Sequence, residues 1–249
     1  MFRIIVRLDV KPPNLVKGIQ LEGVRKIGRP VDFAEKYYIG GADELFYQDV
    51  VASLYGRNSI KELIKETAQK VFIPVTVGGG IRSIEDIQEL LRSGADKVSI
   101  NTAAIDNPDI INEASRIFGS QCVTVALEIM HSGASTWEPL TMSGRQRSTL
   151  NAMDWAKEVV ERGAGELLVT VIAREGGKMG FDFDFAESLI NEVDVPVVLH
   201  GGAGKPSDVI DAAKRGLSGV AIASMFHYNL YSIKDVKDGL KKARIQVRV

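Results

Sequence analysis

Eight short runs of β-branched and apolar residues recur along the chain, and segments with helical spacing lie between most of them. The runs cover residues 2–9, 44–50, 73–78, 96–100, 122–128, 166–172, 195–200 and 218–223. Short apolar runs bounded by turn residues are typical of strands buried in a parallel sheet. The pattern therefore predicts strands alternating with helices, which places the chain in the α/β class.

The segment 83–94 is the clearest of the predicted helices. Ser83 and Asp86 have the spacing of a capping box at its start. Ile87 and Leu90 fall on one face, and Gly94 is suited to end the helix. Eight strand–helix units in 249 residues predict a (β/α)8 barrel, with an open doubly wound sheet as the rival arrangement.

Two halves of the chain repeat one another at a constant offset. The segment GGADELFYQDV, which contains Glu44, resembles RGAGELLVTVI, which contains Glu166, and the two glutamates are 122 positions apart. Gly79 and Gly201 are also 122 positions apart. This repeat favours a closed (β/α)8 TIM barrel built of two similar half-barrels over an open sheet. No linker-like composition separates the halves, so we expect one barrel domain covering residues 1–249.

Composition and charge exclude several classes of protein. The net charge of −1 gives no overall field that would attract nucleic acid or an anionic membrane, and no apolar run approaches the roughly 18 residues of a transmembrane helix. Cys122 is the one cysteine, which rules out an internal disulfide and favours a cytoplasmic setting. The three histidines are far apart in sequence, so we expect neither a metal site nor a cofactor.

Each half carries a β-rich run followed by a glycine cluster, a basic residue and a serine, in VTVGGGIRS and PVVLHGGAGKPS. Glycine-rich turns expose backbone N–H groups and the next helix adds a positive dipole, which together suit a phosphate. We expect two phosphate sites across one barrel mouth and a ligand with a phosphate at each end. The alternative is that the glycines only make tight turns. The predicted binding residues are Gly79, Gly80, Asn101, Thr102, Gly201, Gly202, Ala223 and Ser224.

The motifs resemble those of the HisF family, the cyclase subunit of imidazole glycerol phosphate synthase, over essentially the whole chain. They include LDVK, VKG, GADEL, IPVTVGGGIRS, GADKVSINTAA, RGAGELL and GGAGK. The resemblance implies that a HisH-like glutaminase docks at the strand N-terminal face and that ammonia passes up the barrel axis. It also implies a lyase reaction that cleaves a bis-phosphorylated ribulosyl ligand and closes an imidazole ring. Lys17, Thr170 and Gly176 match family positions that bind substrate or phosphate, and Asp9 and Glu128 match the catalytic carboxylates.

Strand alternation independently predicts a charged lumen. Alternate residues of a strand share one face. If the residue at the carboxyl end of a strand points into the barrel, every second residue back to the N-terminal end of that strand does so too. Arg3, Glu44, Lys97 and Glu166 fall at the bottoms of four strands, where they can form a ring of alternating charge. The resemblance implies that this ring is an ammonia gate, and the alternative is a rim of solvated charges.

The predicted mouth departs from the HisF pattern at several positions. Glu128 stands where the family has an aspartate, and Arg7 stands where the family usually has a cysteine. We expect Arg7 to hydrogen-bond Asp9, lower its pKa and make it a weaker base. The other departures are Ala173, Glu175, Gly177 and His200.

Three hypotheses follow from this mixture of matches and departures. The departures favour a HisF-like paralogue associated with glycosyl amidation, which supplies ammonia from a glutaminase to a sugar amidotransferase in polysaccharide biosynthesis. The alternative is a true cyclase subunit of histidine biosynthesis with a divergent site. A HisA-type isomerase is the third, and the charged ring counts against it because an isomerase needs no ammonia passage.

Overall fold

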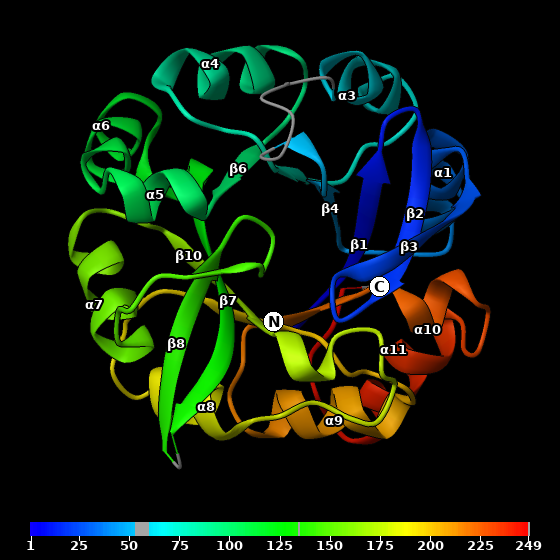
Figure 1. Cartoon of the computed structure of the whole chain (residues 1–249). Helices are drawn as coiled ribbons and strands as arrows, with labels where there is room; N and C mark the ends of the chain where they lie inside the picture. Colours follow the sequence, from blue (N-terminus) through cyan, green and yellow to red (C-terminus); the bar gives the residue numbers. More distant parts are fainter. Residues whose placement is uncertain (53–59, 134, 249) are drawn as a thin grey trace.

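The computed structural model describes residues 1–52, 60–133 and 135–248 (Figure 1). The predicted domain of residues 1–249 also includes 53–59, 134 and 249, which lie outside the described residues. Within the described part, eight parallel strands pair in chain order and close on one another, because β7 pairs with β10. These strands are β1 (Arg3–Lys11), β4 (Glu44–Asp49), β5 (Val75–Gly78), β6 (Lys97–Ile100), β7 (Val123–Gly133), β10 (Glu166–Val171), β11 (Val197–His200) and β12 (Gly219–Ile222). The predicted closed barrel is therefore confirmed, and the open sheet is not formed.

Helices surround the barrel in an outer ring (Figure 1). They include α1 (Pro30–Ile39), α3 (Lys61–Ala68), α4 (Ile84–Arg92), α6 (Asp109–Phe118), α7 (Ala152–Glu161), α8 (Asp184–Leu189), α9 (Pro206–Lys214) and α11 (Ile233–Lys242). The short helices α5 (Thr102–Asp106) and α10 (Ser224–His227) follow β6 and β12. The predicted cap of α4 is formed in part: the Ser83 hydroxyl accepts a hydrogen bond from the Asp86 backbone N–H, whereas the Asp86 carboxylate accepts from the Arg82 backbone N–H and not from that of Ser83. No helix in the described ranges is both long and apolar enough to cross a membrane.

Apolar side chains are packed in two separate shells. The larger shell lies between the strands and the helices and holds most of the buried aliphatic residues. A smaller cluster is formed by inward-facing residues of the strands. Its members are Ile5, Phe46, Leu168, Val198 and Ala221. On β1, β4 and β10, this cluster lies two residues above the predicted charged ring and two residues below Arg7, Gln48 and Thr170.

The repeat found in the sequence has a counterpart in the backbone. Gly79 and Gly201 adopt φ values of +98° and +96° at the carboxyl ends of β5 and β11. A Cβ atom at Gly79 would lie 2.2 Å from the Asp49 carbonyl oxygen, so a larger residue cannot take this conformation. Asn101 and Ala223 also share unusual dihedrals, with φ/ψ of −129°/−84° and −120°/−78°. The two glycine turns are therefore built alike.

Two antiparallel additions to the barrel were not predicted. After β1 the chain forms a hairpin of β2 (Asn14–Ile19) and β3 (Glu22–Gly28), and β2 pairs with the end of β1. After β7 it forms β8 (Thr136–Thr141), which pairs back on β7, and β9 (Gln146–Arg147). Figure 1 shows both additions in front of the barrel. The first of them carries Lys17 to the mouth.

A buried histidine joins α10 to α1. His227 is 4% exposed, and its Nδ1 atom lies 2.7 Å from the Tyr37 hydroxyl oxygen. The two rings are stacked with centroids 5.7 Å apart. Burial lowers the pKa of His227 to about 4, so the ring is neutral in the native protein at neutral pH.

We expect His227 to make folding stability depend on pH on the acid side. In the unfolded chain the histidine takes up a proton near pH 6.5, whereas the native protein does so only near the lowered pKa. The contribution of neutral His227 to the free energy of unfolding is therefore fully present above about pH 6.5. It is lost as the pH falls towards about 4, and the total loss is about 3 kcal/mol. Urea unfolding across this range should give a shallower loss for His227→Asn than for wild type. An equal loss in both proteins would contradict the assignment, and the exposed His131→Asn serves as the control.

Candidate functional site

Four charged side chains meet at the N-terminal ends of the barrel strands. Arg3 Nη1 lies 2.8 Å from Glu44 Oε1 and 2.6 Å from Glu166 Oε2. Lys97 Nζ lies 3.2 Å from Glu44 Oε2 and 3.3 Å from Glu166 Oε1. Each cation contacts both carboxylates, so the ring has balanced charges and each glutamate is held from two sides. This geometry matches the alternating ring expected from strand parity, whereas a solvated rim would leave the side chains more exposed than the observed 9–19%.

Above this ring the lumen becomes apolar and then charged again. The inner cluster around Phe46 occupies the next layer, and the Arg7 guanidinium lies 5.6 Å from the centroid of the Phe46 ring. Arg7 is only 2% exposed. An apolar layer admits a small neutral molecule at far lower cost than an ion. An ion could therefore cross the layer between the ring and the mouth only at high cost.

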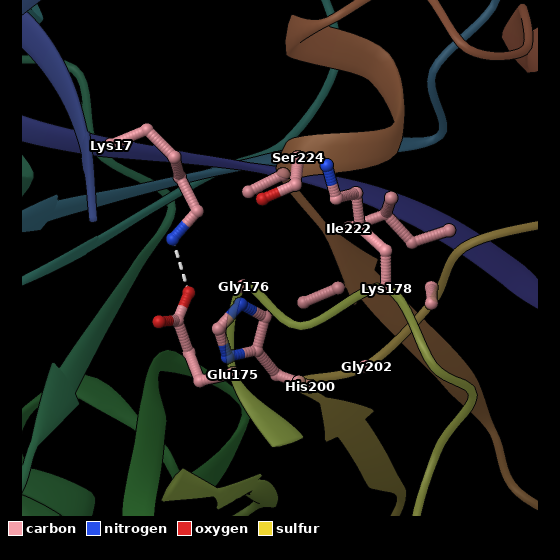
Figure 2. Close-up of a pocket in the computed structure, with 12 residues that line it drawn as sticks. Lys17, Glu175, Gly176, Lys178, His200, Gly202, Ile222 and Ser224 are labelled. Carbon is pink, nitrogen blue, oxygen red and sulfur yellow. Dashed lines mark hydrogen bonds and ion pairs between the residues drawn. The ribbon is translucent and has the colours of Figure 1, made fainter. Parts of the chain in front are cut away.

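A chain of ion pairs crosses the barrel mouth. Arg7 Nε donates to Asp9 Oδ1 at 2.7 Å, as expected from the sequence, and Lys17 Nζ lies 3.3 Å from Asp9 Oδ2. Lys17 also pairs with Glu175, which follows β10 (Figure 2). The second oxygen of Glu175 accepts a hydrogen bond from the Leu21 backbone N–H at 3.0 Å. Glu175 therefore ties the β2–β3 hairpin to the opposite side of the mouth.

The two predicted catalytic carboxylates have pKa values shifted in opposite directions. Burial alone would raise the pKa of Asp9, but the charges of Arg7 and Lys17 outweigh burial and hold it well below its usual range. Burial raises the pKa of Glu128, and the negative charge of Asp9 raises it further, against the opposing effects of Arg7 and Asn101. Opposite shifts of this kind favour an ionised base at Asp9 and make Glu128 the better proton donor of the two.

The first glycine turn forms a pocket beside Glu128. Asn101 Nδ2 donates to Glu128 Oε2 at 3.1 Å, and the Thr102 hydroxyl accepts from the Met142 backbone N–H at 3.0 Å. The pocket brings together the four residues predicted for the first glycine turn and the strand after it, Gly79, Gly80, Asn101 and Thr102. Its lining includes Gln48, Gly79, Gly80, Ser99, Asn101, Thr102, Glu128 and Ser143.

The second glycine turn forms a similar pocket on the other side of the mouth. Its lining includes Lys17, Glu175, Gly176, Lys178, His200, Gly201, Gly202, Ala223 and Ser224 (Figure 2). Thr170 differs from the other predicted binding residues, because it is fully buried and lines neither of these two pockets. Its hydroxyl oxygen lies 3.3 Å from His200 Nδ1, so it contacts the wall of this pocket from behind.

Comparison with known proteins decides the family. Residues 3–232 match the model of a family described as histidine biosynthesis protein. The chain is 51% identical to the imidazole glycerol phosphate synthase subunit HisF of Legionella pneumophila, over 82% of this chain and 96% of that protein. It is 44% and 40% identical to the HisF subunits of Caulobacter vibrioides and Thermococcus onnurineus, each over 99% of this chain and at least 96% of the relative. The chain belongs to the HisF family.

The contacts of two residues in this HisF-family chain, Glu175 and His200, were not foreseen from its sequence. Glu175 is one of the departures from the HisF pattern, and the sequence predicted no contact for it. Its ion pair with Lys17 and its hydrogen bond from Leu21 depend on a hairpin that was not predicted. His200 contacts Arg7, with Nδ1 and Nη1 3.3 Å apart. The signal for the contact between His200 and Arg7 was that both positions depart from the HisF pattern together, which is typical of neighbouring side chains.

Proposed function

We propose that this chain is a cytoplasmic, single-domain cyclase-type subunit of an imidazole glycerol phosphate synthase. It receives ammonia from a glutaminase at the strand N-terminal face and uses it on a bis-phosphorylated ribulosyl ligand, in a lyase reaction of histidine biosynthesis. The names of its relatives support this function, which was the alternative in the sequence analysis, over the glycosyl amidation paralogue. The observation that carries the proposal is the order of groups along one barrel axis: the charged ring, the apolar layer, and then two carboxylates with oppositely shifted pKa values between two glycine turns.

The proposed chemistry of the mouth uses these opposite pKa shifts, with Asp9 as the base and Glu128 as the acid. Ammonia that passes Arg7 attacks the ribulosyl carbonyl carbon, and a C–N bond forms as the carbonyl π bond breaks. Glu128 gives its proton to the carbonyl oxygen, and Asp9 accepts a proton from the nitrogen, so the charges balance at the carbinolamine. The two glycine turns hold the terminal phosphates and fix the carbonyl between the carboxylates, which is the positioning that such a transfer requires.

The proposed route for ammonia predicts that the ring couples the two subunits. In Lys97→Ala the ring loses one of the two cations that bridge Glu44 and Glu166, so Arg3 alone offsets the repulsion between the two buried carboxylates. With the glutaminase bound, glutamine hydrolysis should continue while less of the released ammonia is used at the mouth. The measurement is the ratio of ammonia incorporated to glutamate formed.

The matched control for this ratio is Lys157→Ala. Lys157 pairs with Glu192 at the outer surface, and both side chains are more than 40% exposed, so the ratio should stay at its wild-type value. A wild-type ratio in Lys97→Ala as well would contradict the passage of ammonia through the ring.

A second candidate function is favoured by the contacts of Asp9. Because Arg7 and Lys17 occupy its two oxygens, Asp9 is a weaker base than a free carboxylate. A subunit that only supplies ammonia to a sugar amidotransferase, in polysaccharide biosynthesis, needs no such base. This glycosyl amidation function predicts phosphate binding and glutaminase docking without ring closure.

A further inference from the structure

His200 occupies a position in the second pocket where its ring faces both the protein interior and the ligand space. It is the last residue of β11, it is 3% exposed, and Gly201 and Gly202 follow it directly. Figure 2 shows its ring pointing into the space bounded by Lys17, Gly176 and Ser224. One nitrogen, Nδ1, is turned towards Arg7 and Thr170, each at 3.3 Å.

The contact with Arg7 fixes which ring nitrogen carries the proton. A guanidinium has only N–H donors, so Nδ1 must accept the hydrogen bond and must itself be unprotonated. Burial and the Arg7 charge also lower the pKa of His200 well below the ordinary value, so the ring stays neutral. The single proton of a neutral imidazole is then on Nε2, which makes that nitrogen a donor.

We propose that His200 binds the anionic group of the ligand through Nε2–H, and that Arg7 is the positioning residue that holds His200 in this tautomer. The pocket therefore selects a ligand oxygen that accepts hydrogen bonds, such as a phosphate oxygen. Ser224 and Lys17 line the same pocket and can add further donors. The inference deepens the proposed function, because it rests on the anion-binding part of that function and not on ring closure.

The first test measures the protonation state of the His200 ring. Nitrogen-15 NMR of histidine-labelled protein, recorded between about pH 5 and pH 8, should show His200 neutral with its proton on Nε2 throughout. The charged groups that face this space are Arg7, Asp9, Lys17, Glu175 and Lys178. The pKa values of Arg7 and Lys17 are raised and that of Asp9 is lowered, so these three keep their charges over this range. Detection of a doubly protonated His200, or of a proton on Nδ1 in the wild type, would overturn the proposal.

Binding of inorganic sulfate to the full chain provides the second test, because sulfate keeps its charge where phosphate titrates. His200→Ala should weaken sulfate binding by about tenfold or more, as expected for a lost hydrogen bond to a charged acceptor. His200→Gln keeps a side-chain N–H and should recover part of this loss. The control His131→Gln changes a histidine that lines a different pocket and should bind sulfate as the wild type does.

The tautomer itself is tested by Arg7→Leu, which removes a donor to Nδ1. The NMR spectrum of this variant should show a population with the proton on Nδ1, together with weaker sulfate binding. Unchanged affinity in His200→Ala, or no sulfate binding by the wild type, would overturn the inference. None of these measurements depends on turnover, so a chain that binds sulfate through His200 but closes no ring would contradict the proposed function alone.

Discussion

Replacing Glu128 with glutamine should lower ammonium-dependent turnover by a factor of about 10² to 10⁴, the usual cost of losing a general acid. Glutamine keeps the size of the side chain and an oxygen that can accept the Asn101 hydrogen bond, but it has no acidic proton to give. Burial and the neighbouring Asp9 raise the pKa of Glu128, so its carboxyl keeps its proton to higher pH than a free glutamate does. Steady-state turnover at saturating ammonium measures the loss.

The control for this variant is Glu138→Gln. Glu138 is also a buried glutamate, but it lies on β8 and accepts a hydrogen bond from the Thr149 backbone N–H at 2.7 Å, away from both pockets. Its replacement should leave turnover close to that of the wild type. If Glu128→Gln kept wild-type turnover, Glu128 would not be the acid.

Removing one partner of the Arg7–Asp9 ion pair should lower the free energy of unfolding, and the loss should differ between the two partners. Among the described residues Asp9 is the one ion-pair partner of Arg7, whereas Asp9 also pairs with Lys17. Asp9→Leu should therefore destabilise the protein by about 3–5 kcal/mol, because it leaves a buried guanidinium without its ion-pair partner. Arg7→Leu should cost less, because Asp9 keeps Lys17. Urea unfolding at neutral pH measures both losses.

The double variant Arg7→Leu/Asp9→Leu completes this cycle. Removing both charges also removes the uncompensated guanidinium, so the double variant should be more stable than Asp9→Leu alone. Simple addition of the two single losses would show that the pair is not energetically coupled, and would contradict the network across the mouth.

The barrel and its charged ring could be predicted because they depend on periodic features of the sequence. Strand alternation places Arg3 and Glu44 on inward faces, and the constant offset of 122 positions relates Gly79 to Gly201. Strand alternation is a property of one strand, and the offset is a comparison of two sequence segments. Both can therefore be recognised without knowing how the chain packs. The α4 cap at Ser83 is predictable for the same reason.

The mouth was less predictable because its contacts join distant parts of the chain. His200 and Arg7 are on β11 and β1, and no pattern along either strand shows that Nδ1 and Nη1 lie 3.3 Å apart. The β2–β3 hairpin, which carries Lys17 to Glu175, has no simple alternation of buried and exposed residues along β3. Thr170 matched a binding position, yet its neighbour His200 stands between it and the pocket, since the larger ring replaces a small residue.

The names of the relatives moved the preference from the amidation paralogue to the cyclase, and the electrostatics of the mouth are compatible with that change. From the sequence, Arg7 counted against catalysis because it weakens Asp9 as a base. The structure adds that the same cluster keeps Asp9 ionised while Glu128 has its pKa raised, so the two carboxylates are divided into a base and an acid. A weakened base lowers the rate of a proton transfer, whereas two carboxylates in the same protonation state would prevent the paired transfer altogether.

The most direct measurement is the fate of nitrogen-15 ammonium supplied with the bis-phosphorylated ribulosyl substrate and the purified chain. If the chain is a cyclase, the label enters an imidazole ring, with turnover on the order of 1 per second, within the ordinary range for enzymes. The label should enter the ring far more slowly with Glu128→Gln. If the wild-type chain binds the substrate through its phosphates and leaves it intact with no labelled imidazole, the cyclase function is wrong and the ammonia-supplying role in sugar amidation takes its place.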